Sequence, residues 1–249
     1  MRHLQNLVSR SFACVKGLCA IKFPKSPILD ELLHWLANAC LPLKKVVFSE
    51  CYNFSFVGNL EVVNVLNDGS MIDLFEYLFR LKSINLDLCS KLTNSTFFTL
   101  KRECPVLSEI RMKSTNLGVE EFTTDDEFMK KVAFICLNLQ LLDVSDCRII
   151  TEEGIGEILK SCGEIQCLRI EQCRHINSFR IKHFEVKKLV VLQVGASRID
   201  NDALITIANT CPWLLYLNLS SVENCRALRE ILFYFCRNVD TNILSGIVF

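Results

Sequence analysis

A nine-residue pattern, L-x-x-L-x-L-x-x-C, recurs along this chain and constrains its fold more than any other feature. The clearest copies are Leu81–Cys89, Leu139–Cys147 and Ile165–Cys173, and weaker copies begin at Leu18, Leu43, Leu107, Leu189, Leu214 and Leu228. Five of the eight spacings between successive starts are 24–26 residues, which is the period of a leucine-rich repeat. We therefore expect stacked units that bury a core only together.

Each unit is expected to contain a short strand, a turn and a helix. Template positions 4 and 6 are apolar and alternate with outward-facing positions, as one face of a strand requires. Helix starts are indicated where Thr93, Thr151, Asp200 and Asp240 follow the turn, because these residue types cap helix N-termini. Apolar residues then recur at the spacing i, i+3, i+4 and i+7, which favours an amphipathic helix.

The same repeat explains most of the 14 cysteines. Thiols are expected to fill the inward bend at the ninth position, where small side chains fit among buried backbone groups. The predicted structural thiols are Cys51, Cys89, Cys147, Cys173 and Cys236. No C-x-x-C spacing occurs, so we expect neither a metal site nor a disulfide framework.

Composition narrows the function. The 28 basic and 28 acidic residues leave no net charge, which argues against a nucleic-acid partner. No apolar run reaches the length of a membrane span, and we expect no membrane partner. No phosphate-binding loop, nucleophile elbow or H-E-x-x-H motif is present, so we expect no catalytic residues, no cofactor and no enzymatic activity.

The segments 81–105, 139–162 and 189–212 resemble the cysteine-containing leucine-rich repeat of plant F-box proteins, in the ribonuclease-inhibitor-like superfamily. The resemblance implies an α/β solenoid, a right-handed horseshoe with parallel strands on the concave side and helices on the convex side. It also implies substrate-recognition repeats of a Skp-cullin-F-box ubiquitin ligase, acting in ubiquitin-dependent protein catabolism in the cytoplasm, the nucleus or both.

The domain organisation departs from that family. Residues 1–17 read as a partial repeat helix, followed by a solenoid of about nine units over 18–249, and no F-box is recognised. Insertions are expected near 52–70 and 118–128, and a shortened unit near 214–228. A Skp-type adaptor is expected only if an F-box lies upstream. The alternatives are an F-box-less scaffold and a truncated, non-functional fragment.

Template positions 3, 5 and 7 are expected to face the concave surface, because positions 4 and 6 face the core. That surface is the predicted binding site for a protein substrate. Its candidate contact residues are Lys45, Asn85, Arg111, Asp143, Arg169, Gln193, Tyr216, Asn218 and Tyr234. The charges of Arg111, Asp143 and Arg169 indicate either a recognition strip or cross-strand pairs that satisfy one another.

Overall fold

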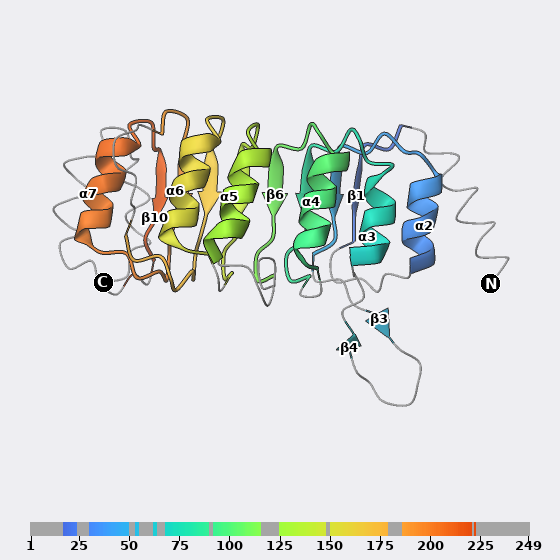
Figure 1. Ribbon diagram of the computed structural model, residues 1–249, viewed down its shortest axis with the longest axis horizontal. Coiled ribbons are helices and arrows are strands. Elements are labelled where there is room, and N and C mark those ends of the chain that lie inside the picture. The colour runs from blue at the N-terminus through green and yellow to red at the C-terminus, as the bar shows by residue number, and fades with distance from the viewer. Residues whose placement is uncertain are drawn as a thin grey trace. The chain divides into compact units, whose positions relative to one another are not determined.

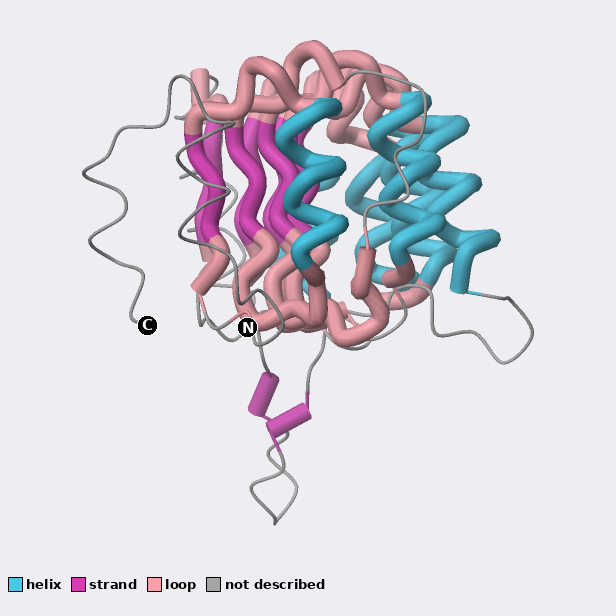
Figure 2. The backbone as a smooth tube through the Cα atoms, turned by 90° about the vertical axis from the view of Figure 1, so that its left-hand side faces the viewer, coloured by secondary structure: helices cyan, strands magenta, loops and turns pink. Residues whose placement is uncertain are grey.

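The computed structural model describes residues 17–23, 30–49, 53–54, 62–63, 68–89, 92–115, 125–147, 150–178, 186–220 and 222. The chain divides into two compact units, Met1–Leu117 (unit 1) and Gly118–Phe249 (unit 2). In each unit the strands form one layer and the described helices form another on one side of it (Figures 1 and 2). The strand side away from the helices is called the open face below.

Unit 1 contains four parallel strands in the order β1 (Ala20–Lys22), β2 (Lys45–Val47), β5 (Ser83–Asn85) and β6 (Glu109–Arg111). Its helices are α2 (Asp30–Asn38), α3 (Asp68–Phe75) and α4 (Asn94–Glu103). A separate antiparallel pair joins β3 (Asn53–Phe54) to β4 (Val62–Val63).

Unit 2 repeats the arrangement. Its strands β7 (Leu141–Asp143), β8 (Cys167–Arg169), β9 (Val191–Gln193) and β10 (Tyr216–Asn218) are parallel neighbours in chain order. Its helices are α5 (Asp125–Ile135), α6 (Glu152–Ser161) and α7 (Asn201–Thr210).

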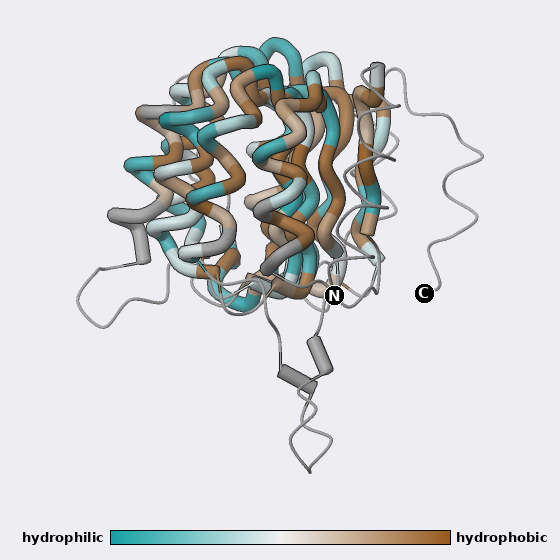
Figure 3. Tube along the Cα trace, turned by 90° about the vertical axis from the view of Figure 1, so that its right-hand side faces the viewer, coloured by the Kyte–Doolittle hydropathy of each residue, from teal (hydrophilic) through white to brown (hydrophobic). Residues whose placement is uncertain are grey.

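The eight repeat strands confirm the register expected from the sequence. Every one of them begins at the third position of its template, two residues after the predicted start. The core positions are also as expected, because Ile84 and Leu86 in unit 1 and Leu168 and Ile170 in unit 2 are at most 1% exposed. Figure 3 shows such hydrophobic stretches alternating with hydrophilic ones along the strands and helices.

The predicted helix caps are present wherever the structure describes them. The Thr93, Thr151 and Asp200 side chains accept hydrogen bonds from the backbone N–H groups of Ser95, Gly154 and Ala203. Each of these helices ends at a cysteine, Cys104, Cys162 or Cys211, whose N–H closes the last helical bond. The cap expected at Asp240 lies outside the described residues.

The turns after β5, β6, β7, β8 and β9 share a feature that was not predicted from the sequence. The eighth template residue has a positive φ, between 52° and 62°, at Leu88, Ser114, Asp146, Gln172 and Ala196. Four of these residues donate their N–H to the seventh-position carbonyl of the next repeat, at 2.7–2.9 Å. The left-handed backbone continues the strand ladder into the turn, although it costs a residue with a side chain about 1 kcal/mol.

Described helices begin inside both segments where insertions are expected, which the sequence pattern did not predict. Helix α3 begins at Asp68, inside the range 52–70, and α5 begins at Asp125, inside 118–128. The hairpin of β3 and β4 within the first insertion was not foreseen either. The partial helix at 1–17 lies outside the described residues except Gly17, and so does the shortened unit beyond Val222.

Candidate protein-binding surface

Ninth-position thiols hold the turns beneath the open face. Cys89 and Cys173 are at most 1% exposed, and each donates from Sγ to the sixth-position carbonyl of the preceding repeat. The acceptors are Phe48 O at 3.2 Å and Val144 O at 3.3 Å. Cys147, at the same template position, is also buried. Cys51 and Cys236 lie outside the described residues.

Burial keeps Cys173 and two thiols at helix ends protonated. It raises the pKa of Cys173 to about 12, although hydrogen bonds from backbone groups of Cys147 and Asp146 oppose the shift. Burial likewise raises the pKa of Cys104, at the end of α4, to about 12 and that of Cys211, at the end of α7, to about 11. A protonated, buried thiol is a poor nucleophile and a poor metal ligand, so these groups act as small hydrogen-bonding core residues.

The open face of unit 1 is polar, and its side chains bond mainly to one another. Ser83 Oγ donates to Glu109 Oε2 at 2.8 Å, which joins β5 to β6. Asn85 donates to the Asp87 carboxylate at 2.9 Å, and that carboxylate also accepts from Lys113 N at 2.9 Å. Lys45 is exposed at the third position of β2. Several polar groups of this surface are therefore satisfied within unit 1.

The open face of unit 2 is organised in two parallel rows. The apolar row contains the third-position residues Leu141, Cys167, Val191 and Tyr216, which are paired side by side across β7–β10 and all partly exposed. The polar row contains the fifth-position residues Asp143, Arg169, Gln193 and Asn218 in the same register. A partner can therefore find apolar contact and hydrogen bonds on adjacent lines.

Among the candidate contact residues that the structure describes, Asp143 is the one whose expected exposure is wrong. It lies on the predicted strand position, but only 5% of its surface is exposed. Its Oδ1 accepts from Ser145 N at 3.2 Å, and its Oδ2 lies 3.7 Å from Arg169 Nη1. The carboxylate turns back onto its own strand beneath the guanidinium, so Arg169 presents the charge of this pair to solvent.

Arg169 is incompletely bonded. Its side chain is 32% exposed, whereas its Nε is buried and has no hydrogen-bond partner among the described residues. The 3.7 Å separation from Asp143 is too long for a hydrogen bond. The guanidinium therefore retains donor capacity that an acceptor on a partner can use.

Gly195, two residues beyond β9, leaves room for a contact that was not predicted from the sequence. Asn218 Nδ2 donates to Glu171 Oε1 at 2.7 Å, from β10 to the end of β8, across the intervening repeat. A Cβ on Gly195 would lie 3.3 Å from Glu171 Oε1 and 2.7 Å from Ser220 Oγ. Gly195 occupies the seventh template position, where other repeats have side chains. This glycine was the sequence signal that could have predicted the contact.

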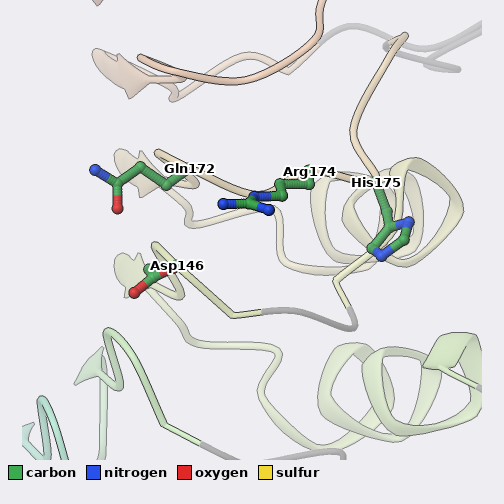
Figure 4. Close-up of a pocket in the computed structure, with 4 residues that line it drawn as sticks. All are labelled: Asp146, Gln172, Arg174 and His175. Atoms are coloured by element: carbon green, nitrogen blue, oxygen red, sulfur yellow. The ribbon is translucent and has the colours of Figure 1, made fainter.

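A polar pocket of about 370 Å³ lies at the turns of unit 2. Asp146 comes from one turn, and Gln172, Arg174 and His175 come from the next (Figure 4). All four residues are exposed. The pocket is shallow and solvated, and no group of three His, Cys, Asp or Glu side chains suited to a metal occurs among the residues that the structure describes.

The remaining candidate contact residues lie where the repeat places them. Asn85, Arg111, Gln193, Tyr216 and Asn218 are partly exposed on the open faces of their own units. Tyr234 lies outside the described residues. Among the described helices, none is long and apolar enough to cross a membrane.

Comparison with known proteins places the fold. No protein-family model matches the sequence. The F-box protein SKIP1 of Arabidopsis thaliana is 26% identical over 136 residues, which cover 47% of this chain and 43% of SKIP1. The chain thus spans less than half of this curated relative.

Two solved structures share the architecture. A chain from the Rad7–Elc1 complex in yeast matches with a TM-score of 0.63 and 13% identity, covering 86% of this chain and 52% of that one. A chain from the TLR13–ssRNA13 complex matches with a TM-score of 0.54 and 16% identity, covering 86% and 31%. The fold is therefore an α/β leucine-rich-repeat solenoid, as the sequence pattern predicted.

Proposed function

We propose that this chain is the protein-recognition part of a Skp-cullin-F-box ubiquitin ligase. In this role its open face binds a protein destined for ubiquitination, and the chain itself catalyses nothing. Two observations together support this role: the sequence is similar to that of an F-box protein, and the fold is a leucine-rich-repeat solenoid. The amphipathic rows on β7–β10 supply a surface of the type that binds protein segments.

In this role, substrate binding and adaptor binding belong to different segments. The described repeats carry the recognition surface, whereas adaptor binding requires an F-box outside them. Such a ligase subunit acts in the cytoplasm or the nucleus. Since the matched region covers 43% of SKIP1, the test uses the complete gene product rather than the repeats alone.

The test is affinity purification of the tagged, complete gene product from cells in which the proteasome is inhibited. A Skp-type adaptor and a cullin are expected to co-purify, together with at least one ubiquitinated protein. The matched control deletes the segment upstream of Leu18, which should remove the adaptor but keep the bound protein. Absence of both adaptor and cullin from the complete product would refute ligase membership and favour a free-standing repeat scaffold.

A further inference from the structure

We propose that the open face of unit 2 binds an extended protein segment in which an acidic residue directly neighbours a large apolar one. This inference rests on the proposed function, since it names the class of segment that the recognition part would take. The site consists of the apolar row (Leu141, Cys167, Val191 and Tyr216) and the polar row centred on Arg169.

The alternation follows from the geometry of the rows. Both rows lie on the same face, two residues apart along each strand. Successive side chains of an extended segment point to opposite sides. A segment lying between the rows therefore directs one side chain to the apolar row and the next to the polar row.

The length of the rows sets the length of the segment. Three spacings between four adjacent strands amount to about 14 Å. An extended chain advances about 3.3 Å per residue, so four or five residues span the rows. Over five residues the alternation directs three side chains to the apolar row and two to the polar row, and the acidic residue is the one beside Arg169.

Arg169 selects an acid for the polar row. Its side chain is 32% exposed, and its Nη1 lies 3.7 Å from the Asp143 carboxylate, beyond hydrogen-bond distance, so the exposed part of the guanidinium can donate to a partner. A carboxylate matches the planar guanidinium, which can donate two parallel hydrogen bonds. The side chain of Gln193, the next residue of the row, is partly exposed and can supply a further donor.

Glu171 restricts the acidic residue of the bound segment to the fifth-position row. It lies two residues beyond Arg169 on the same face, and its Oε1 is held by Asn218 at 2.7 Å. Its negative charge repels a second carboxylate at the seventh-position line. An acidic residue is therefore accepted beside Arg169 and disfavoured one step farther along the strand direction.

The chemistry of unit 1 does not offer an equivalent site. Its third-position row contains Ala20, Lys45, Ser83 and Glu109, and the last two are hydrogen-bonded to each other. Arg111 occupies the same template position as Arg169 but has no apolar row beside it. Arg111 is therefore a matched control for the loss of an arginine on an open face.

The probe is a phage library of random 12-residue peptides selected on the full chain. Wild type and Arg111→Gln should enrich segments with Asp or Glu next to a large apolar residue. The double variant Asp143→Asn/Arg169→Gln, which removes both charges together and leaves no buried ion alone, should lose that enrichment. Equal acid enrichment on the double variant, or none on wild type, would overturn the proposal.

A defined peptide sharpens the result. In the most enriched sequence, Glu→Gln should weaken binding to wild type about tenfold and leave binding to the double variant unchanged, as a double-mutant cycle for one direct contact requires. Arg169→Lys, which keeps the charge but loses the fork, should show an intermediate loss. If the double variant melts far below wild type, peptide binding to wild type and to Arg169→Lys is compared instead to test the contact.

Cysteine protection locates the peptide independently. Cys167 is a partly exposed thiol within the apolar row, and Cys40 is an exposed thiol in unit 1. Saturating peptide should slow N-ethylmaleimide modification of Cys167 and leave that of Cys40 unchanged. Protection of neither thiol would place the peptide elsewhere and refute the site. Adaptor co-purification is measured separately, so a ligase without this specificity and a binder without an adaptor give different results.

Discussion

The open faces of the two units differ in what lies beside their arginines. In unit 1, Arg111 shares its face with Lys45 and with the hydrogen-bonded pair Ser83 and Glu109. In unit 2, Arg169 lies beside a row of partly exposed apolar side chains and above a buried Asp143. The same repeat frame thus supports a mainly polar surface in one unit and an amphipathic one in the other. Sequence periodicity determines the frame, whereas the outward positions determine what can bind.

The largest expected effect tests whether the buried Asp143 contributes to the folding stability of unit 2. Asp143→Lys would bury a cation beside Arg169 and should cost about 3–5 kcal/mol of unfolding free energy. Gln193→Lys, at the same template position but partly exposed, should cost less than about 0.5 kcal/mol. Chemical denaturation measures both. An unaltered midpoint for Asp143→Lys would mean that the position is open to solvent.

The shared frame predicts equal sensitivity in the two units. Ile84 in unit 1 and Leu168 in unit 2 occupy the fourth template position and are at most 1% exposed. Substitution of either by Ala removes buried methyl groups and should cost about 2–5 kcal/mol. Thermal melting of the two variants provides the comparison. A loss in only one unit would show that the repeats do not share one packing scheme.

The ninth-position thiol should tolerate small residues and reject large ones. Cys173→Leu must fit extra carbon atoms into a filled turn, and overpacking of this kind costs about 1–3 kcal/mol. Cys173→Ser should be milder, because Ser197 and Thr115 already occupy this position in other repeats. The control is Cys167→Leu on the open face, which should leave the denaturation midpoint nearly unchanged. Equal losses at both sites would contradict the assigned role of the turn.

Asp68 makes a pH-dependent contact in unit 1. Burial opposes its ionisation, but hydrogen bonds from Thr93 and Thr96 outweigh burial and lower the pKa of Asp68 below its ordinary value of 3.8. The carboxylate thus stabilises the fold above pH 3.8, and this contribution is lost as the pH falls through the folded pKa. Asp68→Asn should cost about 1 kcal/mol at neutral pH.

The measurement for Asp68 is the melting temperature of wild type and Asp68→Asn between pH 7 and pH 3. The difference should shrink as the pH falls below about 4, because protonation weakens the same contact in wild type. Unit 2 provides the comparison, since Glu152 accepts from Ser178 N and Oγ in the corresponding place. A difference that grows in acid would have the wrong sign.

The smallest expected effect concerns the left-handed turn residue. Ala196 has a φ of 52°, so Ala196→Gly removes backbone strain and should raise stability by up to about 1 kcal/mol. Ala208 lies inside α7, where the same change should lower stability by about 0.5–1 kcal/mol. Opposite signs in differential scanning calorimetry would confirm the assignment. Destabilisation by both changes would show that the turn is not strained.

Sequence reasoning succeeded where one residue type alone sets the structure. The strand starts, the core at Ile84 and Leu168, and the caps at Thr93 and Thr151 all follow from local pattern. The burial of Asp143 does not, because it depends on Arg169 from the next repeat. The left-handed turns were also missed, since no glycine marks them and the ladder bonds that impose them are non-local.

The direction of the thiol bonds has a consequence for how such a chain changes in length. Cys89 and Cys173 each donate backward, to the carbonyl of the preceding repeat. A complete repeat that is duplicated or lost brings or removes its own donor together with one acceptor, and the new neighbours can form the same bond. Insertion or loss of only part of a repeat leaves a thiol donor or a carbonyl acceptor without its counterpart. Gene rearrangements that survive should therefore be counted in whole repeats, with partial changes confined to segments outside the turn.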